Sequence, residues 1–388
     1  MSQPRDMQAP SIPNLLSLRG SNRGPRGRNR GRGGHPGTGA SSQAQQDATV
    51  QGTDTDAAVM RLSAVELGYL DDRFAQYFVQ GQQPHRRLPI INRGTYTRTT
   101  ALDRLIDSFL GPDPGADEPL PRRQIVSLGA GTDTRCFRLF SSQNRRRGLI
   151  YHEVDFPPIS SRKRMVVQAT PALRSVLPDP VPSDDGPAAA SWRSTPEGDG
   201  NQYWCHGLDL RDLSRNAEQG DLLLSRLEGI RTDVPTLLIS ECCLCYLETA
   251  EAQNVIKCFV DRIPDLGLVL YEPVKPDDAF GRQMASNLAA RKIRMPTLEV
   301  YRQPKDQEGR LREAGFTEVR QKTVDSIWGQ WVSEEEKERV DGLEGLDEVE
   351  EWQLLAGHYI VAWGWRGPRL EAMKGMDITQ CSENTSNT

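Results

Sequence analysis

Acidic residues and glycines stand where several predicted strands end. Short apolar runs bounded by turn residues are typical of buried strands in a parallel sheet. Such runs predict strands at residues 125–128, 148–155, 203–210 and 234–240. Gly129 and Gly131 follow the first run, and Asp155, Asp209 and Glu241 lie at the ends of the other three. Ligands of open α/β sheets bind outside the carboxyl ends of the strands, so we expect these five residues to share one site.

The glycine turn and Asp155 suggest a bound nucleotide. Glycine lets the backbone turn tightly and approach a ligand closely, and the helix expected next points its N–H groups at the same place. Asp155 comes 24 residues after Gly131, close to the roughly 20-residue spacing of an acid that binds a ribose hydroxyl. Thr134 occupies the position of the third glycine of the dinucleotide fingerprint. The alternatives are therefore a tight turn that binds nothing and an Asp155 that only caps the next helix.

The other strand-end residues favour an adenosine-containing methyl donor. Asp209 followed by Leu210 suits an adenine, which offers an amino group as donor and an apolar face. Glu241 directly follows an apolar strand and needs a partner, because a buried carboxylate is costly without one. NAD and S-adenosylmethionine both fit these features. The missing third glycine and the additional acids favour S-adenosylmethionine.

Arginines that precede the first strand could bind the carboxylate of such a donor. Arg93 and Arg98 lie in the segment before that strand, and Arg61 is a further candidate. A surface ion pair is the alternative for each of them.

The order of the predicted elements indicates the fold class. Strands alternate with helices as far as a fifth strand at residues 266–271, and two more strands are expected at 317–324 and 359–365. This pattern predicts an α/β, doubly wound, Rossmann-like fold with a mostly parallel seven-stranded sheet whose last strand is antiparallel. Helices before the first strand, one of them at residues 99–110, should form an N-terminal helical cap.

Composition divides the 388 residues into three parts. Residues 1–55 hold few apolar side chains and an Arg/Gly-rich segment, so we expect a disordered arm. Residues 56–366 should form the folded domain, with residues 171–201 as an inserted surface loop rich in Pro, Ser, Gly and Asp. Residues 367–388 are expected to form a polar tail.

Charge and cysteine content bear on partners and compartment. The net charge is −5, yet the first 50 residues carry seven arginines against two aspartates, so contact with nucleic acid is expected only through the arm. No apolar run approaches the ~20 residues of a membrane span, and no metal site is expected. Seven cysteines, three of them crowded at 242, 243 and 245, indicate a reducing compartment. We interpret those three as small buried residues rather than nucleophiles, and we expect a monomer in the cytoplasm or the nucleus.

Six motifs resemble the leucine carboxyl methyltransferase family in order and spacing, in a fungal-like form with an extended N-terminal arm. They are INRGTYTR (91–98), QIVSLGAGTDTRCFRL (124–139), HEVDFP (152–157), LDLRDL (208–213), PTLLISECCLCYL (235–247) and YEPV (271–274). The resemblance implies the class I fold of S-adenosylmethionine-dependent methyltransferases. It also implies methylation of the C-terminal leucine carboxylate of the protein phosphatase 2A catalytic subunit, which regulates assembly of the phosphatase holoenzyme. The donor would leave as S-adenosylhomocysteine.

The resemblance also assigns cofactor contacts, residue by residue. They fall on Arg98 for the methionine carboxylate, Gly129 in the turn, Asp155 for the ribose, Asp209 and Leu210 around the adenine, and Glu241 near the methionine part. A further basic contact falls on Arg61, where other members can have lysine.

The proposed nucleophile makes modest demands on the enzyme. A peptide α-carboxylate has a reference pKa of about 3.3–3.7 and is ionised at neutral pH, so no general base is needed. Catalysis would come from positioning and partial desolvation of this carboxylate. We expect Arg93 and Tyr246, with Tyr96 nearby, to bind it.

Three other functions compete with this hypothesis. One is a tRNA-hypermodifying carboxyl methyltransferase of the same superfamily; such enzymes carry a long C-terminal repeat domain, and no repeats are expected here. Another is a bacterial-type O-methyltransferase of small molecules. A third is a non-catalytic RNA-binding adaptor that uses the arm alone, which predicts salt-sensitive RNA binding and no cofactor affinity.

Overall fold

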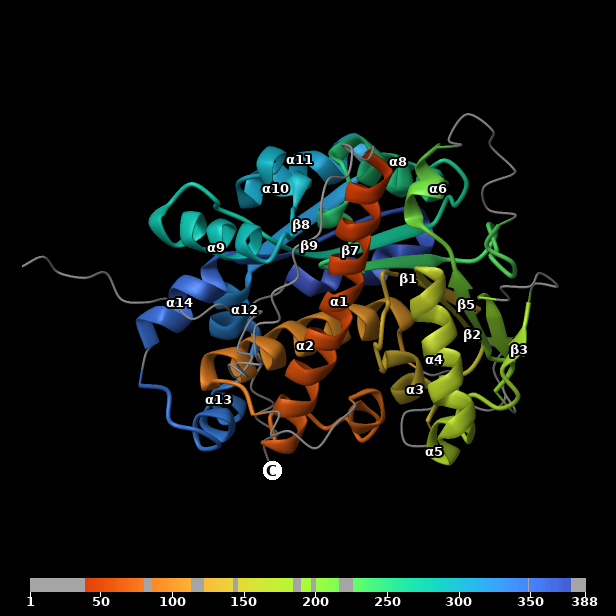
Figure 1. Ribbon diagram of the computed structural model, residues 1–388, viewed down its shortest axis with the longest axis horizontal. Coiled ribbons are helices and arrows are strands. Elements are labelled where there is room, and N and C mark those ends of the chain that lie inside the picture. The colour runs from red at the N-terminus through yellow and green to blue at the C-terminus, as the bar shows by residue number, and fades with distance from the viewer. Residues whose placement is uncertain are drawn as a thin grey trace, which may run out of the picture.

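One mixed sheet organises the chain in the computed structural model, which describes residues 39–79, 86–112, 122–141, 146–183, 190–196, 200–215, 226–347 and 349–377 (Figure 1). The strand order is β3-β4-β5-β2-β1-β6-β7-β9-β8. The strands are β1 (Arg123–Leu128), β2 (Leu149–Asp155), β3 (Val181–Pro182), β4 (Trp192–Ser194), β5 (Gln202–Gly207), β6 (Thr236–Glu241), β7 (Leu266–Pro273), β8 (Glu318–Thr323) and β9 (Tyr359–Arg366).

The predicted fold class is confirmed. Strands β5, β2, β1, β6 and β7 are parallel, and β9 runs antiparallel to both of its neighbours, β7 and β8. All seven predicted strands are present in this part of the sheet. The order in which successive strands are added to the sheet reverses at β1, which pairs with β2 on one side and β6 on the other. An open α/β sheet has its ligand crevice at such a point.

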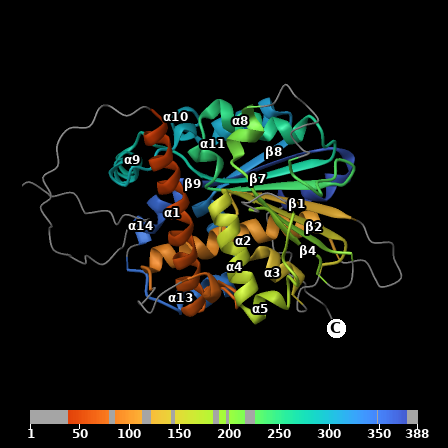
Figure 2. The same ribbon diagram turned by 45° about the vertical axis from the view of Figure 1, so that its right-hand side comes forward.

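Alternation along the strands divides the core into two layers. Val126 of β1 and Leu238 of β6 belong to one apolar cluster, whereas Ile125 and Leu237 belong to the other, because successive side chains of a strand point to opposite faces. Helices cover both faces (Figure 2). One layer holds α2 (Pro89–Leu110), α3 (Arg135–Phe140), α4 (Pro157–Ala169) and α5 (Pro171–Arg174), and the other holds α6 (Leu210–Arg215), α8 (Thr249–Val260) and α11 (Pro304–Ala314).

Further helices surround these layers. Helices α1 (Gly39–Glu66) and η1 (Ala75–Phe78) precede α2 and complete the predicted N-terminal cap. The later segments are η3 (Leu244–Tyr246), α9 (Ala279–Ala290), α10 (Pro296–Val300), α12 (Val324–Trp331), α13 (Glu334–Asp341), α14 (Val349–Gly357) and η4 (Pro368–Asp377). None of the described helices is long and apolar enough to cross a membrane.

The expected disorder of residues 1–55 is wrong for residues 39–55. Helix α1 begins at Gly39 and continues to Glu66. Low apolar content suggested disorder, but α1 is held by polar contacts: Asp47 accepts a 2.7 Å hydrogen bond from Arg211 Nη2, and Asp54 accepts one of 2.7 Å from the Thr132 N–H. Residues 1–38, including the Arg/Gly-rich segment, lie outside the described residues.

The segment predicted as a surface loop, residues 171–201, contributes α5, β3 and β4. Strand β4 pairs antiparallel with β5 and extends the sheet beyond the seven predicted strands. Trp192 of β4 is fully buried and packs against Tyr203 with ring centroids 5.0 Å apart. The polar composition of residues 171–201 concealed β4, because a strand of three residues is too short to show periodicity.

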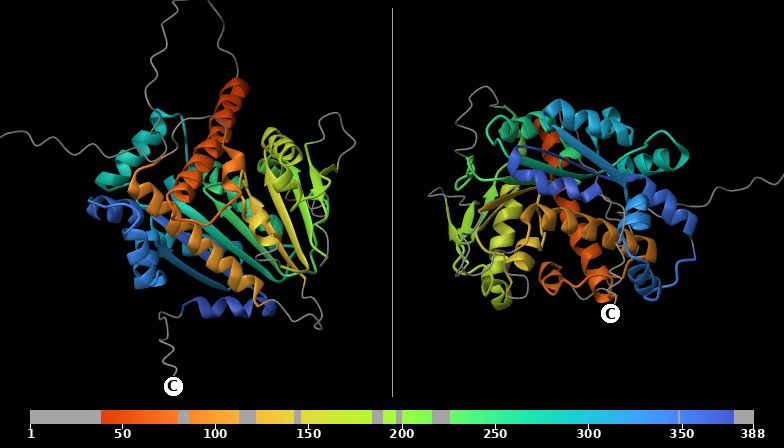
Figure 3. Two further views of the ribbon diagram at one scale, coloured as in Figure 1. Left: turned by 90° about the horizontal axis from the view of Figure 1, so that it is seen from below. Right: turned by 180° about the vertical axis from the view of Figure 1, so that it is seen from behind.

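The expected polar tail is also partly structured. Residues 368–377 form η4, which lies along α2 (Figure 3). Leu370 and Met373 are buried, and Arg369 Nε donates a 2.7 Å hydrogen bond to Asp265 Oδ2. Two apolar side chains are too few to show in the composition of a polar segment. Residues 378–388 lie outside the described part of the chain.

Trp192 should anchor the added strands. We predict that Trp192→Ala lowers the free energy of unfolding by about 3–5 kcal/mol, because a large aromatic side chain leaves a cavity in a packed core. Urea denaturation followed by tryptophan fluorescence and circular dichroism measures this change. Val181→Ala is the matched control on β3, because Val181 is 49% exposed. An unchanged free energy of unfolding in Trp192→Ala would show that these strands add nothing to the core.

Candidate active site

A cavity of about 380 Å³ lies at the carboxyl ends of the central strands. The residues that follow β1, β2, β5 and β6 line it, and α1 forms a further wall with residues from Gln43 to Arg61. Helices α2 and α14 contribute to the lining as well. All the predicted cofactor residues line this cavity: Arg61, Arg98, Gly129, Asp155, Asp209, Leu210 and Glu241.

The glycine turn comes unusually close to other parts of the chain. Gly129 and Gly131 have positive φ angles of 64° and 52°, a region that disfavours side chains. A Cβ atom at Gly129 would collide with Cys243 Sγ, and one at Gly131 would collide with the Asp54 carboxylate. The first glycine therefore allows contact with the β6 loop, and the second allows α1 to approach the turn.

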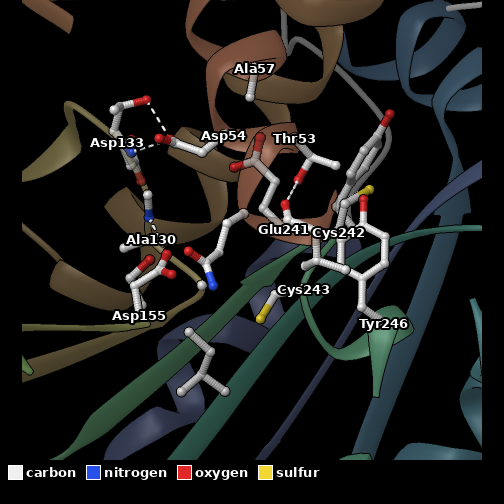
Figure 4. Close-up of a pocket in the computed structure, with 18 of the residues that line it drawn as sticks. Thr53, Asp54, Ala57, Ala130, Asp133, Asp155, Glu241, Cys242, Cys243 and Tyr246 are labelled. Carbon is white, nitrogen blue, oxygen red and sulfur yellow. Dashed lines mark hydrogen bonds between the residues drawn. The ribbon is translucent and has the colours of Figure 1, made fainter. Parts of the chain in front are cut away.

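Asp155 and Asp54 fix the turn from two sides (Figure 4). The Gly131 N–H donates to Asp155 Oδ2 at 2.7 Å, and the Phe156 N–H donates to Asp155 Oδ1 at 2.7 Å. Asp54 Oδ1 accepts from both the N–H and the hydroxyl of Thr132, at 2.7 and 2.8 Å. Burial raises the pKa of Asp155 to about 6, although the two backbone N–H groups oppose this shift.

Asp209 lies beyond β5 and is bound by Arg211. Arg211 donates to the carboxylate of Asp209 through Nε at 3.0 Å and through Nη2 at 2.6 Å. The same Nη2 also donates to Asp47 of α1, at 2.7 Å. Leu210 is buried beside them in the cavity wall. The acid expected near an adenine is thus connected to α1 through one guanidinium group, a link that the sequence reasoning missed.

A cluster of charges surrounds Glu241. Arg98 Nε lies 2.9 Å from Glu241 Oε1, and Arg135 Nη2 donates to Glu241 Oε2 at 2.9 Å. Arg135 also donates to Asp133 at 2.6 Å and to Asp103 at 3.1 Å. Burial opposes the ionisation of Glu241, but the charges of Arg98 and Arg135 outweigh it and lower the pKa of this carboxyl. The buried Glu241 therefore has the partners that its position required.

Arg61 joins the same cluster from α1. Its guanidinium lies 3.5 Å from Asp72 and 3.8 Å from Asp133, and its side chain is buried. Burial raises the pKa of Asp133, but the charges of Arg135 and Arg61 have the larger combined effect and hold it well below its usual range. Asp133 and Arg135 both belong to the glycine motif at residues 124–139. The motif placed them near the site, although no role was predicted for either residue.

Arg93, which we expected to bind the substrate carboxylate, is not among the residues that line this cavity. Its guanidinium pairs with Asp341 and lies 4.7 Å from the ring centroid of Trp328 and 5.8 Å from that of Trp352. Helix α2 starts at Pro89, ten residues before the predicted helix, and proline is favoured in the first turn. Residues 93 and 98 therefore lie on a helix, about 140° apart around its axis, and point to different sides.

Tyr246 does line the cavity, next to the other residues that follow β6. Burial raises the pKa of the Tyr246 hydroxyl well above its usual value. The hydroxyl therefore stays protonated at physiological pH and can donate a hydrogen bond to an anion. Tyr96 lies elsewhere: its hydroxyl donates to Glu336 at 2.9 Å.

The cavity has a polar side and an apolar side. The acids Asp155 and Asp209 follow β2 and β5, which lie on one side of β1 in the sheet. Residues on the other side, around β7 and β9, are mostly apolar or aromatic; they are Ile90, Ile91, Tyr271, Met295, Val324, Trp352, Leu355, Ala356 and Tyr359. The arrangement can accept a polar nucleotide and an apolar group in one continuous space.

This combination defines a class of protein. A mostly parallel sheet with β9 reversed near one edge, a glycine turn after the central strand β1, and acids at the ends of β5, β2 and β6 around it are the fold and site of a class I methyltransferase.

Comparison with known proteins defines the family. Residues 49–260 match the family model described as leucine carboxyl methyltransferase. Leucine carboxyl methyltransferase 1 of Emericella nidulans is 49% identical over 379 residues, 93% of this chain and 95% of the relative. The Aspergillus fumigatus protein of the same name is 47% identical over 392 residues, 92% of this chain and 94% of the relative. The chain therefore belongs to the leucine carboxyl methyltransferase family, and it is a methyltransferase.

A relative with another name is also similar. The human tRNA wybutosine-synthesizing protein 4 is 33% identical over 332 residues, which make up 86% of this chain and 46% of that protein. The similarity to the two fungal proteins is higher and extends over nearly their whole length.

Arg135 should be essential for stability, because it is 2% exposed and contacts three carboxylates. We predict that Arg135→Met lowers the free energy of unfolding by about 3–5 kcal/mol, since three carboxylates lose a shared buried partner and keep one arginine each. Urea denaturation measures the change. Arg231→Met is the matched control, because the Arg231–Asp233 pair is exposed. Adding Glu241→Gln to Arg135→Met should restore part of the loss; no restoration would show that the two residues are not coupled.

Proposed function

We propose that this protein transfers the methyl group of S-adenosylmethionine to the α-carboxylate of the C-terminal leucine of the protein phosphatase 2A catalytic subunit. The products are the methyl ester and S-adenosylhomocysteine. One observation carries the proposal: a single cavity combines strand-end acids suited to an adenosine with an apolar side suited to a leucine side chain. The names of the two fungal relatives support the reaction and the amino acid.

The residues of the cavity fit the proposed donor. Glycines at positive φ let the backbone approach it closely, and Asp155 offers a carboxylate to the ribose hydroxyls. Asp209 and Leu210 offer an acceptor and an apolar surface to the adenine. Arg98 provides a cation for the methionine carboxylate, and Glu241 an anion for the amino group. A cavity of about 380 Å³ lies within the usual range for cofactor sites.

The donor, when bound, supplies a methyl group on a positively charged sulfur, which a carboxylate can attack directly. The protein therefore needs no general base, because the leucine carboxylate is already ionised at neutral pH. What its residues contribute is orientation and exclusion of water. Effective molarity in an oriented pair can be worth about 7–11 kcal/mol.

Tyr246 is the residue that we assign to the leucine carboxylate. Tyr246 keeps its hydroxyl proton and lines the cavity at the end of η3, five residues after Glu241 at the end of β6, so the two ligands would meet at this segment. Arg93, the other predicted contact, is engaged with Asp341 and two tryptophans. The apolar side, including Leu355 and Val324, would surround the leucine side chain.

Methyl transfer to the purified phosphatase catalytic subunit tests the proposal. Label from S-adenosylmethionine should appear on the intact subunit, leave as methanol in mild base, and be absent from a subunit that lacks its final leucine. The similarity to the human wybutosine-synthesizing protein makes tRNA the competing substrate. Label on tRNA and none on the phosphatase would overturn the proposal and assign this second function.

The affinity for S-adenosylmethionine should depend on pH through Asp155. Its pKa is about 6 in the free protein, and only the ionised carboxylate accepts hydrogen bonds from both ribose hydroxyls. We predict constant affinity above about pH 7 and a fall approaching tenfold per unit below about pH 6. Calorimetric titration measures this affinity for S-adenosylmethionine at each pH. Asp155→Asn should bind more weakly and without this pH dependence, whereas Asp261→Asn, on the exposed end of α8, should behave like the wild type. A pH-dependent Asp155→Asn variant would refute the assignment.

Tyr246→Phe should affect the protein substrate more than the donor. Loss of a hydrogen bond to a charged group costs about 1.5–3 kcal/mol, so we predict that KM for the phosphatase rises on the order of tenfold to a hundredfold. The calorimetric affinity for S-adenosylmethionine should stay within about twofold. Tyr301→Phe is the control, because Tyr301 is buried but does not line the cavity. An unchanged KM would remove Tyr246 from this role.

A further inference from the structure

Three cysteines follow β6 at the wall of the cavity. Cys242 and Cys245 are separated by two residues, the C-x-x-C spacing of many redox-active pairs. We expected all three to be buried, but the structure distinguishes them. Cys242 is partly exposed and lines the cavity, whereas Cys245 is fully buried behind it. All six described cysteines are free thiols.

The local backbone brings Cys242 and Cys245 together. Cys242 has a φ angle of 48°, in the left-handed region that is uncommon for residues other than glycine. The short helix η3 then turns the chain back, and the Leu244 N–H donates to Ser240 Oγ at 3.2 Å. Cys245 therefore lies within this turn, three residues after Cys242, and the Cys242 thiol is close enough to raise the pKa of Cys245. A strained conformation at a ligand cavity is a reason to look for a function.

The two thiols differ in accessibility and therefore in role. Burial and the contact with Cys242 raise the pKa of Cys245 well above its usual value, so Cys245 is a poor first nucleophile. Cys242 is the member of the pair that a small reagent in the cavity can reach. Cys243 also lines the cavity, but its Sγ lies against Gly129, and burial raises the pKa of its thiol as well.

We propose that Cys242 and Cys245 form a reversible disulfide that inactivates the site in the presence of low-molecular-weight disulfides. In the first step the Cys242 thiolate attacks one sulfur of a small disulfide, forms a mixed disulfide and releases one small thiolate. In the second, Cys245 loses its proton and attacks the Cys242 sulfur, which forms the Cys242–Cys245 bond and releases the second thiol. The protein loses two electrons and two protons, and the small disulfide gains them.

The position of the pair explains why oxidation would stop the reaction. Glu241 directly precedes Cys242, and Tyr246 directly follows Cys245. A disulfide fixes the two Cβ atoms about 3.5–4.5 Å apart with a set torsion, so oxidation would restrain the segment between Glu241 and Tyr246. The proposal rests on the proposed function only in assigning this cavity to S-adenosylmethionine.

Treatment of the full chain with oxidised glutathione tests the proposal. We expect methyl transfer and calorimetric binding of S-adenosylmethionine to fall by about tenfold or more, and dithiothreitol to restore both. Mass spectrometry should find the peptide with residues 242–245 lighter by two hydrogen atoms. Saturating S-adenosylmethionine should slow the modification, because the donor covers the cavity wall.

Variants locate the effect, each compared with its own reduced form. Cys242→Ser should resist the treatment, Cys245→Ser should stop at the mixed disulfide, and Cys258→Ser, a buried residue of α8 outside the cavity lining, should respond like the wild type. Equal inactivation of Cys242→Ser, or a mixed disulfide in the wild type that never resolves, would overturn the proposed pair. The mass of the peptide and the binding of S-adenosylmethionine are both measured without a methyl acceptor. A failure of leucine methylation alone would therefore count against the proposed function and not against the disulfide.

Discussion

The guanidinium of Arg135 is the contact on which the site depends. It is buried at the start of α3 and binds carboxylates from three separate places: Asp103 of α2, Asp133 of the glycine turn and Glu241 at the end of β6. Arginine suits this position because its planar group offers five donors and stays charged when buried. The N-terminal cap, the turn after β1 and the strand on the other side of the crevice are therefore fixed to one another by a single side chain.

Polar contacts also determine how the cavity is enclosed. Three aspartates of α1 hold it over the cavity. Asp47 pairs with Arg211 of α6, Asp54 with the turn at Thr132, and Asp56 with Arg291 at the end of α9. Directional contacts of this kind fix the position of a helix without a large apolar stripe. The cavity thus has a wall whose sequence is mostly polar, opposite a floor of buried strands.

The sheet and the strand-end residues could be predicted from the sequence because they follow from local patterns. Apolar runs identify buried strands, and parallel strands place their carboxyl ends at one edge, so Asp155, Asp209 and Glu241 were expected to lie together. The missed features depend on contacts between distant residues. Nothing near Arg93 in the sequence indicates that Asp341 and Trp328 pack against it, and nothing near Asp47 indicates Arg211. Composition likewise gave no sign that residues 39–55 are helical, because ion pairs and hydrogen bonds, rather than apolar side chains, hold them in place.

The wall formed by α1 has a practical consequence for anyone who shortens this chain. Trimming to residue 56, the boundary that composition suggests, would keep every strand of the sheet and the whole helix α2. It would also remove the cavity-lining residues between Gln43 and Asp54, among them both partners that reach Arg211 and the glycine turn. We expect such a shortened enzyme to fold and yet to bind its donor poorly. Its weak activity would then be mistaken for evidence that the substrate had been chosen incorrectly.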